Sequence, residues 1–181
     1  MSALELKIPP PVVALVVAAA MWFAAALVSV LAVPASIRIT LAIAIALLGG
    51  VFSLAGMISF RRAKTTVNPM KPEKASSLVT SGIYTITRNP MYLGLLLVLV
   101  GWAVFLSSAV ALAGPVAFFF YIGPFQITPE ERVLANMFGP EYAEYRARVR
   151  RWLNAVGTPI TGRPPHRSER AQLRHSAPTL G

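Results

Sequence analysis

Three long stretches of the chain carry no charged side chain, and short polar segments separate them. They lie between Lys7 and Arg38, between Arg38 and Arg61, and between Arg88 and Glu130, and they hold 30, 22 and 41 residues. A helix needs about 20 apolar residues to cross the roughly 30 Å hydrocarbon core of a bilayer. Each of the first two stretches fits one span. The third is long enough for two, because a helix of that length reaches about 60 Å.

This pattern predicts an all-α membrane protein with about four transmembrane helices in two hairpins. We expect the spans near residues 12–33, 37–60, 91–107 and 109–127. A short turn at Pro34-Ala35-Ser36 joins the first pair, and Ser107-Ser108 is the expected tip of the second pair.

Glycines and prolines inside the spans leave alternatives open. The second span contains Gly49, Gly50 and Gly56, which either permit close helix contact or mark a loosely packed helix. The fourth span contains Gly114-Pro115 and Gly123-Pro124. These pairs interrupt that span and either shape a pocket or only kink the helix.

The composition supports a membrane location, and this location changes how the positive net charge is interpreted. Charged residues are 13% of the chain, about half of the roughly 25% typical of soluble domains. A net charge of +10 would suggest nucleic acid as the partner of a soluble protein. Here the basic residues flank spans, as the positive-inside rule expects, so we predict no nucleic-acid partner. The basic segments before the third span and after the fourth, and the N-terminus, should then lie in the cytoplasm.

Two polar segments should meet at that surface. The first is the loop at residues 61–90, whose apolar positions predict that it folds against the span ends. The second begins with Thr128-Pro129-Glu130-Glu131, which indicates a helix start with threonine as N-cap and Glu131 completing a capping box. Gly139-Pro140 should end that helix and start another. We expect amphipathic helices over 129–153 at the cytoplasmic surface.

The rest of the chain adds no chemistry. Residues 154–181 are rich in proline, arginine, serine and threonine, which predicts a disordered basic tail after a membrane domain at residues 1–153. The only histidines, His166 and His175, lie in that tail and do not indicate a metal site. Without cysteine or aspartate the chain offers neither thiolate chemistry nor a Ser/His/Asp triad.

Several ordered motifs carry a family resemblance. They are Leu78-Val79-Thr80-Ser81-Gly82-Ile83-Tyr84, Arg88-Asn89-Pro90-Met91-Tyr92-Leu93-Gly94, Glu130-Glu131-Arg132-Val133-Leu134 and Phe138-Gly139-Pro140-Glu141-Tyr142. In order and spacing they resemble the isoprenylcysteine carboxyl methyltransferase and phospholipid methyltransferase group, over roughly residues 60–153. The resemblance implies a membrane methyltransferase that binds S-adenosylmethionine in a cytoplasm-facing pocket. The implied cofactor contacts are Ser76, Ser77, Leu78, Val79, Tyr84, Asn89, Pro90, Met91, Tyr92 and Glu130.

The residues themselves permit these roles and also simpler ones. A carboxylate at a span end, such as Glu130, can pair with an ammonium group in a partly dry pocket. Tyr84 and Tyr92 can present ring faces to adenine or to a sulfonium. Glu131 can be only a helix cap, Glu130 can merely favour the helix dipole, and both tyrosines can be interfacial anchors.

Two positions depart from the family pattern. Many members carry histidine where this chain has Asn89, and asparagine cannot titrate near neutral pH. Gln126 stands at the position where enzymes that methylate prenylcysteine place an arginine that meets the substrate. Loss of that cation argues against a carboxylate substrate. We assign Gln126 to substrate binding and name no catalytic residue.

The expected function is methyl transfer from S-adenosylmethionine to a lipophilic acceptor that enters from the bilayer. Two alternatives stay open at this point. One is an NADPH-dependent membrane reductase of the sterol-reductase-like type. The other is a non-catalytic scaffold or lipid-binding protein, which the departures at Asn89 and Gln126 motivate. The sequence does not indicate the oligomeric state.

Overall fold

A computed structural model of the chain describes residues 8–28, 31–63 and 77–153, and all of its regular elements are helical. The predicted tail at 154–181 and part of the predicted loop at 61–90 lie outside these residues. In chain order the elements are α1 (Pro10–Ala26), α2 (Ala35–Arg62), η2 (Gly82–Thr85), α3 (Pro90–Leu106), η3 (Ala109–Leu112), α4 (Ala113–Ile122), η4 (Gly123–Ile127) and α5 (Thr128–Arg148). The all-α prediction is therefore confirmed for the described part of the chain.

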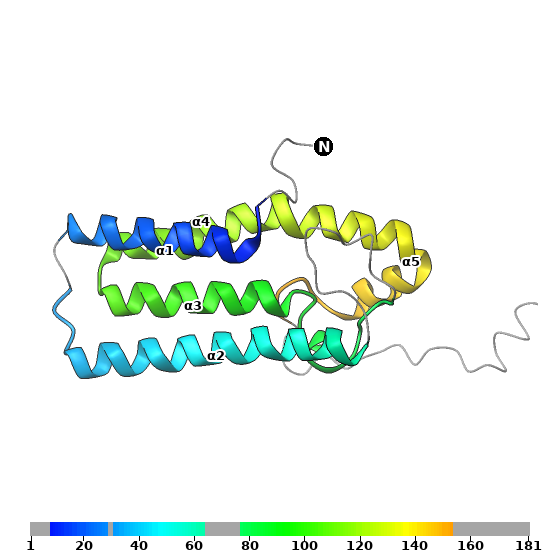
Figure 1. Cartoon of the computed structure of the whole chain (residues 1–181), viewed down its shortest axis with the longest axis horizontal. Helices are drawn as coiled ribbons and strands as arrows, with labels where there is room; N and C mark the ends of the chain where they lie inside the picture. Colours follow the sequence, from blue (N-terminus) through cyan, green and yellow to red (C-terminus); the bar gives the residue numbers. More distant parts are fainter. Residues whose placement is uncertain (1–7, 29–30, 64–76, 154–181) are drawn as a thin grey trace, which may run out of the picture.

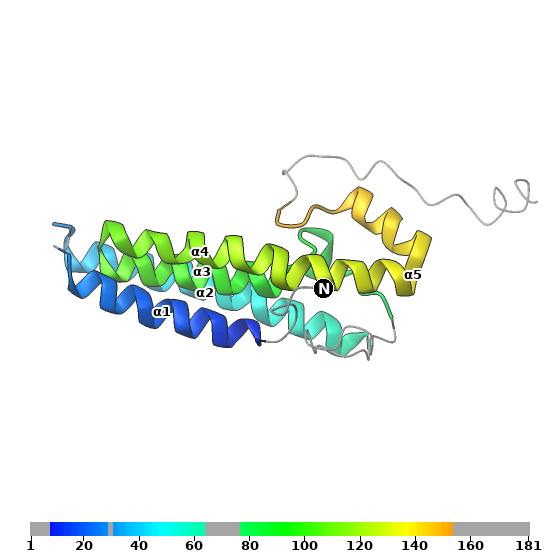
Figure 2. The same cartoon turned by 90° about the horizontal axis from the view of Figure 1, so that it is seen from above.

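The helices α1 to α4 lie side by side, and α5 extends beyond one end of them and folds back (Figures 1 and 2). By length and composition two helical stretches can cross a membrane, Ala35–Arg62 and the continuous helix Ala109–Arg148. The helices α1 and α3 are also apolar but have 17 residues each. The outer surface is apolar too, with Leu15 70%, Phe23 69% and Phe120 69% exposed. An apolar exterior of this extent fits hydrocarbon surroundings better than water.

Glycines bring α2 and α3 into close contact. A Cβ atom placed on Gly49 would lie 2.5 Å from the carbonyl oxygen of Gly94, and one on Gly101 would lie 2.8 Å from that of Ala42. At Gly56 the neighbours are the side chains of Pro90 and Met91. The structure therefore supports close packing at Gly49 and Gly56, whereas a Cβ atom on Gly50 would meet nothing within 4 Å.

The Gly-Pro pairs of the fourth predicted span do not interrupt the helix. Gly114 and Pro115 lie in the first turn of α4, where Gly114 faces Met21 of α1. Gly123 and Pro124 begin the π-helical turn η4, which passes directly into α5. The expectation of two breaks is wrong, because proline in a first turn removes no needed hydrogen bond and the wider turn accommodates the second proline.

The predicted capping box at Thr128 is also wrong. Thr128 has helical backbone angles (φ −64, ψ −43), and no side-chain hydrogen bond caps α5. Because the π-helical turn η4 runs directly into α5, the backbone amides at Thr128 are already in a helix and need no cap. The break predicted at Gly139-Pro140 is confirmed, because Gly139 takes φ 48 and ψ −120 inside α5. This left-handed residue reverses the helix and returns its last turns toward the bundle (Figure 2).

Candidate functional site

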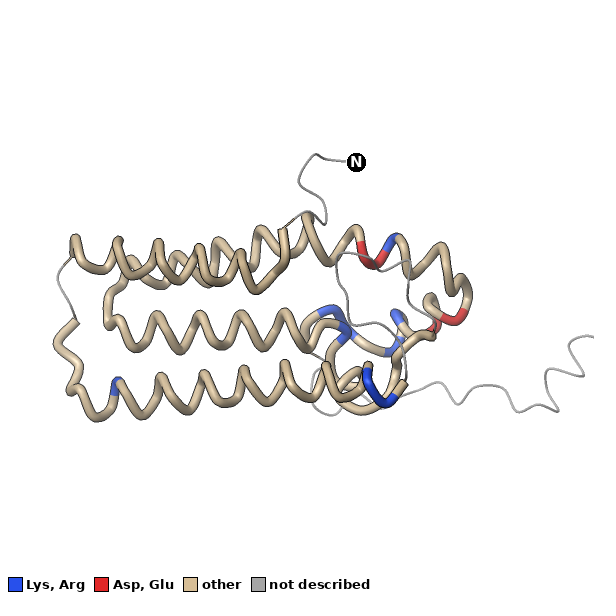
Figure 3. Tube along the Cα trace, viewed as in Figure 1, with Lys and Arg blue, Asp and Glu red and all other residues tan. Residues whose placement is uncertain are grey.

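Charged residues gather at the end of the bundle where α5 folds back (Figure 3). The segment before α3, the start of α5 and the residues after α5 meet there. They share an apolar cluster in which Val79 and Tyr84 pack with Tyr142, Tyr145 and Val149. The two polar segments singled out in the sequence therefore lie together in space.

Glu130 and Tyr92 form the centre of this region. The hydroxyl of Tyr92, in the first turn of α3, donates a hydrogen bond to Oε1 of Glu130 on α5. The pKa of the Glu130 carboxyl is raised to about 8, because burial and the neighbouring charge of Glu131 raise it by more than the hydrogen bond from Tyr92 lowers it. Glu130 is thus a partly buried carboxyl group without a positive partner among the described residues.

Tyr84 lies near the same carboxylate. Burial raises the pKa of its hydroxyl, and the charges of Tyr145 and Glu130 raise it further. The hydroxyl of Tyr145 donates to the carbonyl oxygen of Tyr84 at 2.8 Å, and the Phe60 ring meets the Tyr84 ring edge-on with centroids 5.4 Å apart. These contacts fix the Tyr84 ring in position without using its hydroxyl.

Glu131 joins three separate segments through two arginines. Its Oε1 lies 3.1 Å from Nη1 of Arg88, which precedes α3. Arg151, beyond the end of α5, donates from Nε to Oε1 at 3.2 Å and from Nη2 to Oε2 at 2.5 Å. A two-point contact of this kind fixes orientation as well as distance. Glu131 therefore has an ionic role here in place of the predicted capping role.

Asn89 holds the returning end of the chain. Its Nδ2 donates to the carbonyl oxygen of Arg151 at 2.8 Å, and the hydroxyl of Thr87 donates to the same oxygen at 3.3 Å. The backbone amide of Arg88 donates to the carbonyl oxygen of Arg150 at 3.1 Å. Asn89, the departure from the family's histidine, thus binds backbone and fixes the segment that carries Arg151.

The other predicted site residues are distributed more widely. Ser76 lies outside the described residues. Ser77 donates to the carbonyl oxygen of Ala63 at 3.3 Å, while Leu78 and Val79 pack in the apolar cluster. Pro90 and Met91 lie against Gly56 of α2. Of the ten predicted cofactor contacts, the structure groups Tyr84, Tyr92 and Glu130 most closely.

Gln126 is fully buried in the π-helical turn. Its Nε2 donates to the carbonyl oxygen of Ile8 at 2.8 Å, whereas its Oε1 has no hydrogen-bond partner among the described residues. The amide nitrogen thus donates to the segment before α1, and the oxygen remains an unused acceptor. An unpaired buried acceptor costs free energy, which is a common property of residues kept for a ligand.

Arg88, Arg151, Tyr142 and Tyr145 are parts of this region that sequence reasoning did not assign to it. Arg88 was interpretable only as one of the basic residues that flank the spans. Its position directly before Asn89, in a motif that also contains Tyr92, was the available clue. Arg151 gave no local signal, because its place depends on the reversal at Gly139.

The residues present fit the cationic part of S-adenosylmethionine. That cofactor carries an ammonium and a sulfonium, and Glu130 supplies a carboxyl group that has no cationic partner among the described residues. Tyr84 and Tyr92 supply aromatic rings next to it, which attract cations by about 0.5–2 kcal/mol. This donor set is suited to a positively charged ligand and not to a phosphate, for which basic side chains are needed.

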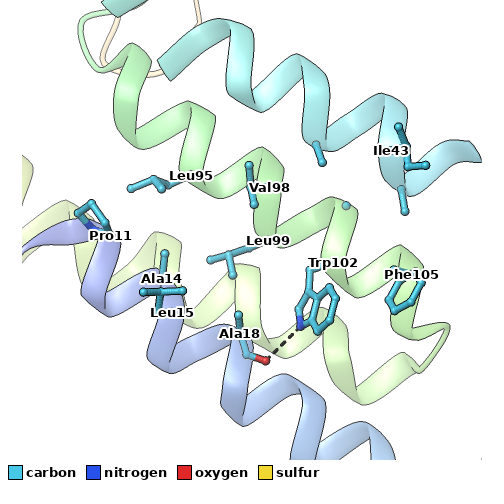
Figure 4. Close-up of a pocket in the computed structure, with 13 residues that line it drawn as sticks. Pro11, Ala14, Leu15, Ala18, Ile43, Leu95, Val98, Leu99, Trp102 and Phe105 are labelled. Carbon is cyan, nitrogen blue, oxygen red and sulfur yellow. Dashed lines mark hydrogen bonds between the residues drawn. The ribbon is translucent and has the colours of Figure 1, made fainter. Parts of the chain in front are cut away.

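A separate apolar groove lies between α1, α2 and α3, inside the apolar part of the bundle (Figure 4). It has a volume of about 620 Å³ and is lined by apolar residues such as Leu15, Ile43, Leu99 and Phe105. The indole Nε1 of Trp102, also in the lining, donates to the carbonyl oxygen of Ala18 at 3.1 Å. The groove therefore offers a ligand no free hydrogen-bonding side chain.

Comparison with known proteins identifies the family. The model for phospholipid methyltransferases matches residues 37–141. Protein-S-isoprenylcysteine O-methyltransferase B of Arabidopsis thaliana is 37% identical over 106 residues, 57% of this chain and 52% of that protein. The Schizosaccharomyces pombe protein-S-isoprenylcysteine O-methyltransferase is 30% identical over 116 residues, 63% of this chain and 48% of that protein. An uncharacterized Haemophilus influenzae protein is 46% identical over 63 residues, 35% of this chain and 100% of that protein.

The chain spans about half the length of the isoprenylcysteine methyltransferases that it matches. No solved structure matches it. Because the family model covers more than half of the sequence, the chain belongs to the phospholipid methyltransferase family of membrane methyltransferases.

Proposed function

We propose that this protein transfers a methyl group from S-adenosylmethionine to a lipophilic acceptor at the boundary between membrane and cytoplasm. The observation that carries the proposal is Glu130, a partly buried carboxylate without a described cationic partner, held by Tyr92 beside Tyr84. The family relation agrees with it. When bound, S-adenosylmethionine supplies an already activated methyl group, so the protein has to position the acceptor and exclude water.

Each part of the site then has a role. Glu130 binds the cofactor's ammonium, and Tyr92 holds the carboxylate in place through its hydroxyl. Tyr84 presents its ring to the cationic cofactor. Glu131, with Arg88 and Arg151, keeps the segment before α3 and the end of the chain together around the site.

Gln126 faces the acceptor in this proposal. Its amide nitrogen already donates to Ile8, while its oxygen has no hydrogen-bond partner among the described residues and is the free acceptor that it offers. An oxygen acceptor suits a group that donates a hydrogen bond, such as an amine or a hydroxyl, and repels a carboxylate. This agrees with the absence of the arginine that prenylcysteine enzymes place here.

The proposed membrane arrangement has four spans in two hairpins within a domain at residues 1–153. The helices α1 and α2 form one hairpin, and α3 with the stretch from η3 to η4 forms the other. Arg61, Arg62 and Arg88 lie near the site end, which the positive-inside rule places in the cytoplasm. The lipophilic acceptor enters from the bilayer, and the cofactor enters from the cytoplasm.

A transfer assay tests this function. Membranes containing the protein are incubated with methyl-labelled S-adenosylmethionine, and label in the extracted lipids is counted. The wild type should label lipid, and Glu130→Gln should lose most of that activity because the neutral amide cannot pair with an ammonium. Glu141→Gln removes a carboxylate from the exposed part of α5 and should retain activity. Equal labelling by Glu130→Gln and the wild type would contradict the assignment of Glu130, and consumption of NADPH without labelling would favour the reductase.

A further inference from the structure

A lone arginine lies at the end of the bundle opposite to the proposed methyltransferase site. Among the described residues, Arg38 on α2 is the one charged residue at that end, while the others gather toward α5 (Figure 3). Residues four apart on a helix lie on one face. Arg38, Ala42 and Ala46 follow this spacing, and the two alanines line the apolar groove. Arg38 therefore lies one turn beyond the groove on the same face of α2.

The Arg38 guanidinium is held beside the groove with unused capacity for hydrogen bonds. Its central carbon lies 5.8 Å from the ring centroid of Phe105, which lines the groove. Its Nε is buried and has no hydrogen-bond partner among the described residues. The first turn of α2 contains no acidic residue, and no side chain caps it. Arg38 is a cation near the N-terminus of α2, where the helix dipole is also positive. A bound anion would offset both positive charges, so this position favours an anion.

The dimensions and chemistry of the groove fit a hydrocarbon chain. Along α3 its lining runs from Leu95 to Phe105, and ten residues of helix rise about 15 Å. That is half of the roughly 30 Å hydrocarbon core, the depth of one leaflet. The helix α2 packs on α3, whereas α1 packs on both α3 and α4, so the groove separates α1 from α2 (Figure 4).

We propose that the groove and Arg38 together bind a phospholipid of the leaflet opposite to the methyltransferase site. One acyl chain fills the groove between α1 and α2, and the phosphate accepts hydrogen bonds from the Arg38 guanidinium. Arginine matches phosphate geometry with its fixed fork of donors. The headgroup lies at the opposite end of the bundle from Glu130, so this lipid is not the methyl acceptor. It stabilises the bundle by filling a gap that side chains leave open.

Lipid binding to the delipidated, detergent-purified protein tests the proposal by native mass spectrometry. The probes are phosphatidylglycerol and a diacylglycerol with the same acyl chains. The wild type should bind phosphatidylglycerol more tightly. Arg38→Gln should weaken phosphatidylglycerol binding about tenfold or more, since hydrogen bonds to charged groups are lost. Its diacylglycerol binding should not change. Arg61→Gln, which removes a charge at the other end of α2, should behave as the wild type.

A second variant pair tests the groove independently of the charge. Ile43→Trp places a larger side chain into the groove from a residue that is 54% exposed, and it should weaken binding of both lipids. Leu48→Trp changes a residue of α2 that is 49% exposed and outside the groove lining, and it should have no effect. Equal phosphatidylglycerol binding by Arg38→Gln and the wild type would overturn the phosphate contact. Equal binding by Ile43→Trp and Leu48→Trp would overturn the groove as the acyl-chain site.

Discussion

Replacing Glu131 by glutamine should destabilise the protein far more than replacing Arg151, the nearer of its two arginine partners, by glutamine. The Glu131 side chain is 10% exposed and that of Arg88 is 11%, whereas that of Arg151 is 36% exposed. Glu131→Gln leaves the Arg88 charge buried without its carboxylate. Removing one partner of a buried ion pair costs about 3–5 kcal/mol. Arg151→Gln leaves Glu131 paired with Arg88 and removes a partly solvated contact, which costs about 1 kcal/mol.

Thermal unfolding in detergent measures this difference. For a chain of this size 1 kcal/mol corresponds to about 2–4 °C in Tm, so Glu131→Gln should lower Tm by about 6–20 °C and Arg151→Gln by about 2–4 °C. The double variant Arg88→Gln with Glu131→Gln should cost less than the sum of its single changes, because neither charge is then left alone. Equal Tm values for Glu131→Gln and Arg151→Gln would refute the distinction between the buried and the solvated contact. Strict additivity in the double variant would refute the coupling between Arg88 and Glu131.

Three further predictions concern pH, packing and the returning chain end. Because the pKa of Glu130 is raised to about 8 from 4.5, its contribution to the stability of the ligand-free protein is present below pH 4.5 and is lost as pH rises to 8. Glu130→Gln should remove that part of the pH dependence of Tm; an unchanged profile would contradict the raised pKa. Gly49→Leu should lower Tm by several degrees because its Cβ would meet the Gly94 backbone, whereas Gly50→Leu, with open space around it, should change Tm little. Asn89→Ala should speed hydrogen exchange at the Arg88 amide, and unchanged exchange would show that Asn89 does not hold the chain end.

The membrane helices were predictable because few charged residues lie in them. The expected spans 37–60 and 91–107 agree with α2 and α3 to within about two residues, since a membrane helix must hide its backbone polar groups and favours apolar side chains. The expected first span, 12–33, is longer than α1, which ends at Ala26. Apolar side chains continue past that point, so hydrophobicity alone could not give the boundary.

The site was predictable where two motifs flank the same pair of helices. Tyr92 at the start of α3 and Glu130 at the start of α5 meet because α3 and the helical stretch from η3 to η4 between them are antiparallel. Local rules failed where tertiary contacts decide the outcome. The Thr128 capping box follows from sequence spacing, but the helix enters through a π-helical turn and Glu131 pairs with Arg88 instead. The Arg151 contact requires the left-handed backbone of Gly139, whose direction no local pattern specifies.

Calorimetric titration of the detergent-purified protein with S-adenosylmethionine tests the central claim most directly. We predict saturable binding to the wild type, retained in Glu141→Gln and weakened about tenfold to a hundredfold in Glu130→Gln, which corresponds to the loss of a charge-assisted hydrogen bond. A parallel titration with NADPH should show no binding. Equal S-adenosylmethionine affinity for Glu130→Gln and the wild type, or binding of NADPH alone to a folded sample, would contradict the account.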